Sequence, residues 1–412
     1  MTYSNQIKES AEGLSIFRIQ DIINESSKAG LANKIVFSRP FTKISTKKFG
    51  SSLFDLDDII DNDIVKATKE ASHKIIAAWK SRGINEKEKA FWHKKSYYYL
   101  LEEEIEFIFS DAWVNLMCLY YFAFKKLIQD NGIKACVLTS GFVDECCIAA
   151  ANQLKVPCII LQHGVLAHTR LDLLQNSYYT TFGDSERDTM LKRCKLDRQK
   201  IVVTGPAILD EVINYSTHVK KNNNAEIKKI LIMTTAFIEN QYMSTDEHFQ
   251  MIESILIQLK KIKGVHITLK LHPVEKRLMK YMDLLKKLSI DGVVYTGLDE
   301  QLNYRLIAES ELLINFGTTA TYMAMLLDTP IVIIDVNKIG LKEFKSCDSV
   351  VFIDKKDIIN ISTIIAGLET TNSRKRFEKA RNNDIRHLFY KADGHSSQRV
   401  VKEIQRLIKS HN

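Results

Sequence analysis

Short apolar runs rich in Val, Ile and Leu recur along this chain from residue 134 onward, separated by stretches of helical character. Runs of this kind, without strict polar alternation, are typical of strands buried on both faces of a parallel sheet. We predict strands at 135–139, 158–162, 178–182, 201–204, 230–233, 265–271, 292–295, 312–315, 331–334 and 350–353. We predict helices at 144–154, 185–194, 248–261, 275–288, 300–309 and 319–327. The alternation predicts an α/β fold of doubly wound parallel sheets.

A polar stretch at 216–224 has no periodicity and divides the alternation into two halves. We therefore predict a Rossmann-like domain over 1–215, a linker over 216–226 and a second Rossmann-like domain over 227–372. The remaining 373–412 is predicted to be helical, without interruption up to residue 410, and to bridge the two domains. Ligands of open α/β sheets bind beyond the carboxyl ends of the strands, so we expect the site in a cleft between the domains.

The composition excludes several other classes of protein. Sixteen Gly and five Pro among 412 residues are too few for a large all-β architecture with many tight turns. The net charge of +8 suits a phosphate-bearing ligand or an anionic membrane surface, and no basic tract indicates nucleic-acid binding. Seven cysteines without CxxC spacing indicate reduced thiols. We expect a cytoplasmic protein, because we find no signal peptide and no apolar run of roughly 20 residues.

The sequence also lacks the patterns of common cofactor and metal sites. It contains no GxGxxG, Walker loop, HExxH or metal-type Cys/His cluster, so we expect no cofactor and no bound metal. The pair Asp55 and Asp57 matches a metal-binding DxD pattern, but it lies in an acidic, helical-looking stretch that is typical of a solvated face. A short strand is predicted before it, at 34–38.

Polar residues follow two predicted strands of the first half. His163 comes directly after the strand 158–162, and an imidazole near neutral pH is suited to general-base work. A histidine with a structural hydrogen bond is the alternative. Gly164 would let a ligand or the other domain approach closely. The cleft at this edge is predicted to be lined by Gln162, Gly164, Ser140, Gly141 and Gly205.

Two acidic residues begin the helix that follows the strand 135–139. Asp144 and Glu145 could orient His163 or act as the base themselves. They are equally well explained as favourable acids in a first helical turn. The residues leave both interpretations open.

In the second half, the strand 265–271 ends in His272 and Pro273. Proline is common at the first position of a helix, so we predict that a helix begins there and that its free N–H groups and His272 bind a phosphate. Lys270 and Thr234, at the ends of neighbouring predicted strands, are assigned to the same phosphate site. A polar turn beside a solvated basic helix face is the alternative.

A second candidate phosphate cradle follows the strand 312–315. Gly317, Thr318 and Thr319 precede a predicted helix, and a glycine with two hydroxyls ahead of free N–H groups suits an anion. A threonine N-cap alone would explain one of the hydroxyls.

Taken in order, these segments resemble the GT-B glycosyltransferases of bacterial surface-polysaccharide synthesis. The resemblance runs from about residue 137 to residue 399 and rests on the order and spacing of short segments: Val156-Pro-Cys-Ile-Ile-Leu-Gln-His-Gly164, Phe182-Gly-Asp184, Ile201-Val-Val-Thr-Gly-Pro206 with Asp210, Leu271-His-Pro273, Gly317-Thr-Thr319, Thr329-Pro-Ile-Val-Ile-Ile334 and Asp393-Gly-His-Ser-Ser-Gln-Arg399. It implies two Rossmann-like domains that face a cleft, with the C-terminal helices packing back.

The resemblance also implies roles for individual residues. The His-Pro pair is similar to that of bacterial sialyltransferases and CDP-glycerol glycerophosphotransferases, in which the histidine contacts the donor phosphate; this implies the same role for His272. The His-Gly pair is similar to one in the glycerophosphotransferases, which implies that His163 is the base. A pair of hydroxyl residues holds the phosphate in sialyltransferases and capsule transferases, which implies that role for Thr318 and Thr319.

The implied reaction is the transfer of a sugar from a nucleotide sugar on domain 227–372 to a saccharide or lipid-linked acceptor on domain 1–215. It needs no metal, and inversion follows if a base acts as described. Many UDP-sugar enzymes of this fold have a glutamate where this chain has Met323, which favours a CMP- or CDP-linked donor over a UDP-linked one. A peripheral contact with the inner membrane is also implied.

Several questions stay open at this point. A CDP-polyol phosphotransferase, a nucleotide-sugar 2-epimerase and a non-catalytic partner that binds a polysaccharide precursor are the alternative functions. The aromatic-rich stretch 88–130 is interpreted as a buried helix pair, with an acceptor cleft or a membrane-facing surface as the alternative.

Overall fold

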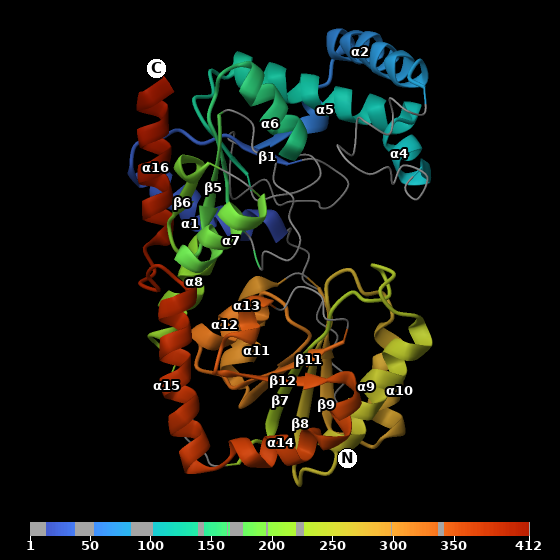
Figure 1. Ribbon diagram of the computed structural model, residues 1–412, viewed down its shortest axis with the longest axis vertical. Helices are drawn as coiled ribbons and strands as arrows, with labels where there is room; N and C mark the ends of the chain where they lie inside the picture. Colours follow the sequence, from blue (N-terminus) through green and yellow to red (C-terminus); the bar gives the residue numbers. More distant parts are fainter. Residues whose placement is uncertain are drawn as a thin grey trace.

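A computed structural model of the chain describes residues 14–37, 53–83, 102–138, 144–162, 164, 176–194, 197–219, 226–297, 299–336 and 342–411. Two α/β lobes lie one above the other in Figure 1, and each contains a parallel sheet. The strands of the upper sheet precede the predicted linker 216–226, and the strands of the lower sheet follow it.

The upper sheet has four parallel strands in the order in which they occur along the chain. They are β3 (Cys136–Leu138), β4 (Cys158–Ile160), β5 (Ser177–Thr181) and β6 (Ile201–Val203). Successive residues of β4 face opposite sides of the sheet: Cys158 packs on the side of α5 (Asp111–Asp130) and α6 (Asp144–Gln153), and Ile159 on the side of α1 (Leu14–Lys28) and α16 (Ser396–His411). Burial on both faces explains the uninterrupted apolar runs.

The rim of the upper lobe is helical. α5 packs between α6 and α2 (Asn62–Lys80), and α4 (Glu102–Ile108) precedes α5 at an angle (Figure 1). The predicted helix pair is therefore present in part: α5 buries Tyr120 and Phe124, whereas Phe107 of α4 is exposed, and residues 84–101 lie outside the described part of the chain. Within the described residues, no single helix is long and apolar enough to cross a membrane, although the bent pair α4–α5 meets that test by length and composition.

A small element of the upper lobe agrees with the prediction in part, since the strand predicted at 34–38 is present. β1 (Ile35–Phe37) pairs in parallel with β2 (Leu53–Asp55), and a 3₁₀ turn, η3 (Leu56–Ile59), follows. The helical interpretation of this stretch is therefore wrong for Asp55, which ends β2, whereas Asp57 lies in the 3₁₀ turn. The exposed Asp57 agrees with a solvated face.

The lower sheet has six parallel strands in the order β12-β11-β10-β7-β8-β9. Their bounds are β7 (Lys229–Met233), β8 (His266–Lys270), β9 (Gly292–Tyr295), β10 (Leu312–Asn315), β11 (Ile331–Asp335) and β12 (Val350–Asp354). The chain extends the sheet to one side of β7 and then returns to the other side of it with β10. This is the doubly wound order, and its topological switch point lies between β7 and β10. The predicted α/β class is confirmed.

Helices cover both faces of the lower sheet. One face packs against α9 (Thr245–Leu259), α10 (Leu278–Lys287) and α14 (Ile361–Leu368), and the other against α11 (Glu300–Glu309) and α12 (Ala320–Leu326). The remaining elements are α7 (Asp184–Cys194), α8 (Asp210–Ser216), α13 (Lys342–Lys345) and the 3₁₀ turns η5 (Arg198–Lys200), η6 (Ala207–Leu209) and η7 (Lys355–Asn360). α9 begins earlier than predicted because Ser244 and Glu247 form a capping box.

The C-terminal stretch crosses from one lobe to the other. α15 (Thr371–Leu388) lies along the lower lobe and α16 along the upper lobe (Figure 1), so the prediction of an uninterrupted helix is wrong. The helix stops because Phe389 packs into the core and the N–H of Tyr390 donates to the carbonyl of Phe182 (2.8 Å). Gly394, at φ +71°, makes the turn into α16.

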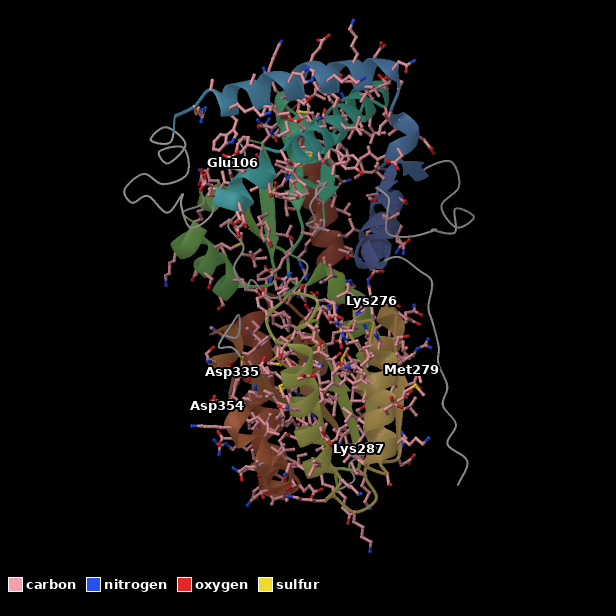
Figure 2. The ribbon with its side chains drawn as sticks, turned by 90° about the vertical axis from the view of Figure 1, so that its right-hand side faces the viewer. Glu106, Lys276, Met279, Lys287, Asp335 and Asp354 are labelled. Carbon is pink, nitrogen blue, oxygen red and sulfur yellow. The ribbon has the colours of Figure 1, made fainter. Side chains whose placement is uncertain are left out.

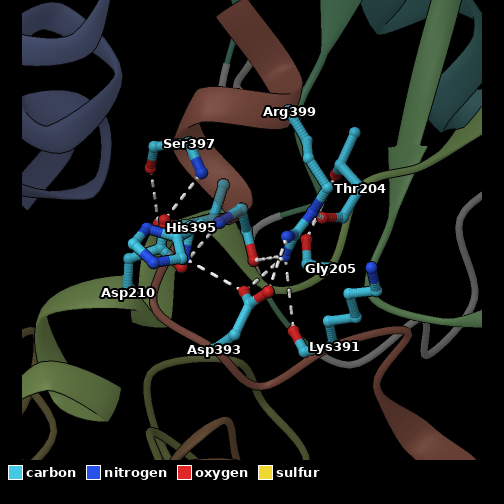
Figure 3. A network of polar contacts seen from close by, with 10 residues as sticks. Thr204, Gly205, Asp210, Lys391, Asp393, His395, Ser397 and Arg399 are labelled. Carbon is cyan, nitrogen blue, oxygen red and sulfur yellow. Dashed lines mark hydrogen bonds and ion pairs between the residues drawn. The ribbon is translucent and has the colours of Figure 1, made fainter.

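Two of the segments on which the family resemblance rests, 201–210 and 393–399, lie far apart in the chain but contact each other at this crossing (Figure 3). The carboxylate of Asp210 accepts hydrogen bonds from the N–H groups of Ser396 (3.1 Å) and Ser397 (2.6 Å) at the start of α16. Arg399 donates from Nε to the carbonyl of Thr204 (2.6 Å) and pairs with Asp393 (3.0 Å). The two segments therefore join the C-terminal helix to the upper lobe.

Gly205 belongs to this junction. Its φ is +88°, and a Cβ there would lie 2.6 Å from Oγ of Ser396. The structure thus places Gly205 against the C-terminal segment, and the prediction that it lines the cleft is wrong because its open side is filled by α16.

Candidate functional site

The candidate residues of the lower lobe gather at the carboxyl ends of three neighbouring strands. Thr234 follows β7, His272 follows β8, and Gly317 comes shortly after β10. Because β7 pairs with both β8 and β10, these residues share one edge of the sheet at its switch point. Ligands of doubly wound sheets bind at such a point.

The segment 317–319 forms a tight turn before α12. Gly317 has φ +80°, and its N–H donates to Oδ1 of the fully buried Asn315 (2.7 Å). Thr319 occupies the N-cap position, but within the described residues its side chain makes no capping hydrogen bond. The hydroxyls of Thr318 and Thr319 belong to half-buried residues, so the turn presents two polar groups at the edge of the sheet.

The two lobes meet at this turn. Gly164, which follows β4 in the upper lobe, is buried against Thr319 of the lower lobe. A Cβ on Gly164 would lie 2.6 Å from Oγ1 of Thr319, so a larger residue here would force the Thr319 hydroxyl or the backbone to move. The structure therefore brings together one residue from each half of the predicted cleft.

A buried polar bridge lies beside this contact. Gln162 donates from Nε2 to Oε1 of Glu186 (2.8 Å) and to the carbonyl of Gly164 (2.9 Å). Tyr322 of α12 donates its hydroxyl to the same oxygen of Glu186 (3.1 Å). Gln162 is 2% exposed, so it holds the Gly164 backbone rather than lining an open cleft, which corrects the prediction. Sequence reasoning missed Glu186 and Tyr322, because an acid in a first helical turn and a tyrosine in an apolar helix give no distinctive signal.

The His272 turn differs from the prediction. α10 begins at Leu278, so Pro273 does not open a helix. Instead, the N–H of Glu275 donates to the carbonyl of His272 (2.9 Å), which closes a turn. The N–H of His272 donates to Oγ1 of Thr234 (2.9 Å) and to Oε1 of Glu275 (3.2 Å). The side chain of Glu275 folds back to accept this N–H, and that contact competes with helix formation.

Glu275 is the centre of a buried polar network that sequence reasoning missed. The hydroxyls of Thr234 and Tyr281 donate to its carboxylate, and Nε2 of His248 contacts the Tyr281 oxygen (2.6 Å). Burial raises the pKa of Glu275, against the effect of the hydrogen bonds that it accepts. Burial lowers the pKa of His248 to about 4, so this histidine is neutral at pH 7. The spacing His272-Pro-Val-Glu275 was the available signal.

The basic residues near His272 have other partners or face outward. Lys270 is 2% exposed, and its ammonium donates to the carbonyls of Leu271 (3.1 Å) and Gly297 (2.8 Å). Lys270 therefore ties β8 to the loop after β9, and its assignment to the phosphate site is wrong. Arg277 pairs with Glu239 (2.5 Å), and Lys276 is exposed with Met279 along the α10 side of the lower lobe (Figure 2).

Thr234 also departs from its predicted role. Its hydroxyl donates to Glu275 and accepts from the His272 backbone, so it supports the His272 turn from below. The proton of this hydroxyl is therefore directed at a carboxylate, which takes it away from a phosphate.

The candidate base residues are described only in part. His163, Ser140 and Gly141 lie outside the described residues, as does the side chain of Asp144, whose backbone begins α6. Glu145 is exposed in the first turn of that helix. Which of His163, Asp144 and Glu145 is the base stays a prediction. In the described part of the chain, no group of three or more His, Cys, Asp or Glu is arranged to hold a metal ion.

Comparison with known proteins shows the fold. No protein-family model matches the chain, and no curated protein matches its sequence. Among solved structures, a putative UDP-N-acetylglucosamine 2-epimerase from Listeria monocytogenes matches with TM-score 0.60 at 11% identity, covering 98% of this chain and 96% of that one. The UDP-GlcNAc 2-epimerase from Neisseria meningitidis, bound to UDP-GlcNAc, matches with TM-score 0.56 at 13% identity, covering 95% and 96%.

A third match comes from outside the epimerases. A glycosyltransferase from Rickettsia africae matches with TM-score 0.52 at 11% identity, covering 98% of this chain and 100% of that one. All three likenesses extend over nearly the whole chain, through both lobes and the C-terminal crossing. The chain therefore has the two-domain GT-B fold.

Proposed function

We propose that this protein is a glycosyltransferase that moves a sugar from a nucleotide sugar to a cell-surface polysaccharide or a lipid-linked acceptor. The observation that carries the proposal is the contact between Gly164 and Thr319. It joins the strand end of the upper lobe to the switch point of the lower lobe, where a donor on one lobe would face an acceptor on the other. A GT-B fold that matches a glycosyltransferase over its whole length supports the proposal.

In this proposal, His272, Thr318 and Thr319 bind the donor phosphate. Their imidazole and hydroxyl groups would donate hydrogen bonds to the oxygens on which negative charge develops as the nucleotide leaves. This is how the protein would stabilise the leaving group without a metal ion. His163, or Asp144 or Glu145, would take the proton of the acceptor hydroxyl, and inversion of the anomeric centre would follow.

The identity of the nucleotide is a separate question. The preference for a cytidine-linked donor is based on Met323, which stands where many UDP-sugar enzymes have a glutamate. Met323 is buried in the core of the lower lobe, and its packing there does not support that preference. The epimerase from Neisseria meningitidis binds UDP-GlcNAc, so UDP-sugars belong among the candidate donors. A thermal-shift screen of UDP, CMP, CDP and GDP tests this, since a ligand that binds the folded state raises the melting temperature.

A nucleotide-sugar 2-epimerase is the second candidate, and the structural likeness to two such enzymes favours it. The two functions differ in what the protein does without an acceptor. An epimerase converts UDP-GlcNAc alone into its 2-epimer, which proton NMR detects. A transferase consumes the donor and releases the nucleotide only when an acceptor is present. Epimer formation without an acceptor would replace the transferase proposal.

The phosphate site is tested by His272→Ala, with His266→Ala as the matched control at the other end of β8. We expect His272→Ala to weaken nucleotide binding by about 1.5–3 kcal/mol, the range for a hydrogen bond to a charged group. His266, which is 3.1 Å from Asp291, should have no effect on binding. Equal affinities for both variants, measured by isothermal titration calorimetry, would remove His272 from the site.

We further propose a cytoplasmic location with a peripheral contact at the inner membrane. The net charge of +8 supports attraction to anionic lipid. Cell fractionation at low and high salt tests this. Recovery in the soluble fraction at every salt concentration would contradict the membrane contact.

A further inference from the structure

The turn that carries His272 is held by one half-buried carboxylate. Glu275 Oε1 accepts from the backbone N–H of His272 (3.2 Å) and from the hydroxyl of Thr234, and its Oε2 accepts from the hydroxyl of Tyr281. These donors come from the ends of β7 and β8 and from α10. One side chain therefore fixes three elements around the candidate phosphate site.

The hydrogen bonds all run toward that carboxylate. Tyr281 has a single hydroxyl proton and gives it to Glu275, so the 2.6 Å contact with His248 requires a protonated Nε2 on the histidine. Nδ1 of His248 is then an acceptor, and it is buried without a partner in the described part of the chain. Three donors directed at one carboxylate stabilise its ionised form.

The turn depends on these side-chain contacts because its backbone has few of its own. It follows β8 but does not belong to a helix, and Pro273 has no N–H to donate. At the start of the turn, the N–H of His272 points at Thr234 and Glu275. Removing the carboxylate would take away one of these acceptors and would leave Thr234 and Tyr281 without the group to which they donate.

We propose that Glu275 is a positioning residue, whose ionised carboxylate sets the place of His272 and thereby the affinity for the donor phosphate. The inference rests on the proposed function and adds a residue that does not itself touch the substrate. His248 and Tyr281 serve the same end, since Tyr281 of α10 donates to Oε2 of Glu275 and His248 of α9 contacts the Tyr281 oxygen.

The charged groups around Glu275 make the predicted nucleotide affinity depend on pH. Glu239 and Arg277 form an ion pair (2.5 Å) nearby, and His248 stays neutral because burial lowers its pKa to about 4. Burial raises the pKa of Glu275, and the carboxylate of Glu239 acts in the same direction. Protonation would turn one acceptor oxygen of Glu275 into a donor. Nucleotide affinity should therefore fall on acidification, above the pH at which an ordinary glutamate titrates.

The test uses the full chain and four variants: Glu275→Ala, Glu275→Gln, Tyr281→Phe and, as the control, Glu253→Gln, which alters a surface ion pair with Lys287. The probe is whichever of UDP, CMP, CDP and GDP binds the wild type most tightly. Its affinity is measured at about pH 5 and about pH 8, a range that brackets a raised carboxyl pKa. Amide hydrogen exchange of residues 272–277 reports the turn directly.

We expect Glu275→Ala to weaken nucleotide binding about tenfold to hundredfold, because a hydrogen bond to a charged group is lost. Glu275→Gln keeps an acceptor for the His272 N–H, so it should restore part of the affinity and reduce the fall in affinity on acidification. Tyr281→Phe should also weaken nucleotide binding, but by a smaller factor. With the donor substrate, KM should rise far more than kcat falls, which a general loss of stability would not produce.

Two results overturn the inference. The first is folded Glu275 variants that bind the nucleotide as Glu253→Gln does, with the wild-type pH dependence. If Glu275→Ala does not fold, the second result decides: Glu275→Gln and Tyr281→Phe would both bind the nucleotide with the affinity and pH dependence of the wild type. A wild type that binds none of the four nucleotides defeats the proposed function and this inference together, whereas tight wild-type binding with unaffected variants defeats this inference alone.

Discussion

At the scale of single residues, Gly164 shows how one absent β-carbon lets the two lobes meet. A Cβ at this position would lie 2.6 Å from Oγ1 of Thr319. We predict that Gly164→Ala lowers the free energy of unfolding by about 1–3 kcal/mol, as overpacking does. Adding Thr319→Ala removes the hydroxyl and should restore part of that loss. Urea unfolding of the two single variants and the double variant measures the coupling, and strictly additive effects would contradict the contact.

The ionisation of Asp21 is expected to make the free energy of unfolding depend on pH. Burial raises the pKa of Asp21 to about 6, the carboxylates of Asp210, Glu211 and Glu25 add to the rise, and Lys28 opposes it. The unfolded chain releases this proton more readily than the folded one, so ionised Asp21 destabilises the fold as the pH rises through about 6. Asp21→Asn should raise the free energy of unfolding by about 1 kcal/mol above pH 7, a value reduced for solvent screening because Asp21 is partly exposed.

The measurement for Asp21 is the melting temperature of wild type and variant across pH. The gain from Asp21→Asn should shrink toward zero near pH 4, where the native residue is protonated in the folded state. A gain that is constant from acid to alkaline pH would show that the charge of Asp21 is not its origin.

At the scale of elements, the start of α16 depends on Asp210. Its carboxylate accepts from the N–H groups of Ser396 and Ser397, which have no helical partner at that end (Figure 3). We predict that Asp210→Ala lowers the free energy of unfolding by about 1–3 kcal/mol, the loss for buried donors left without an acceptor. Amide exchange of α16 should speed up in this variant and not in Asp188→Ala, which alters an exposed acid of α7. Unchanged exchange in both would exclude Asp210 as the cap.

At the scale of the whole molecule, α16 completes the upper lobe. It buries Val400, Val401, Ile404 and Leu407 against the sheet. At about 1.5–3 kcal/mol for each side chain, this burial contributes about 6–12 kcal/mol, as much as the whole stability of a typical domain. We predict that a chain ending at Tyr390, which keeps Phe389 in the core, retains a folded lower lobe but loses the upper one.

Limited proteolysis with mass spectrometry checks this prediction. Cleavage of the chain that ends at Tyr390 should concentrate within the upper lobe, before residue 216. A chain that lacks only residues 410–412 is the control, since its buried contacts are kept. Equal protection of both lobes in the shorter chain would contradict the role of α16.

Much of the fold could be predicted from the sequence. The ten strands from β3 to β12 lie where the apolar runs predicted them, because burial on both faces of a parallel sheet leaves a local signature. The edge that carries Thr234, His272 and Gly317 follows from the same rule, since the polar residues come directly after those runs. The helix predicted at Pro273 was wrong because a side chain, that of Glu275, outweighed the local preference.

The sequence by itself determined the strands, their parallel α/β class and the ends at which polar groups gather, because each depends on neighbours a few residues apart. The tertiary structure alone decided that Gln162 and Lys270 form hydrogen bonds with other groups of the protein itself. It also decided that Gly205 contacts Ser396 and that the C-terminal helix ends before Phe389. These outcomes depend on hydrogen bonds and close packing between segments far apart in the chain. Such partners are fixed only when whole elements pack together, so no local pattern records them.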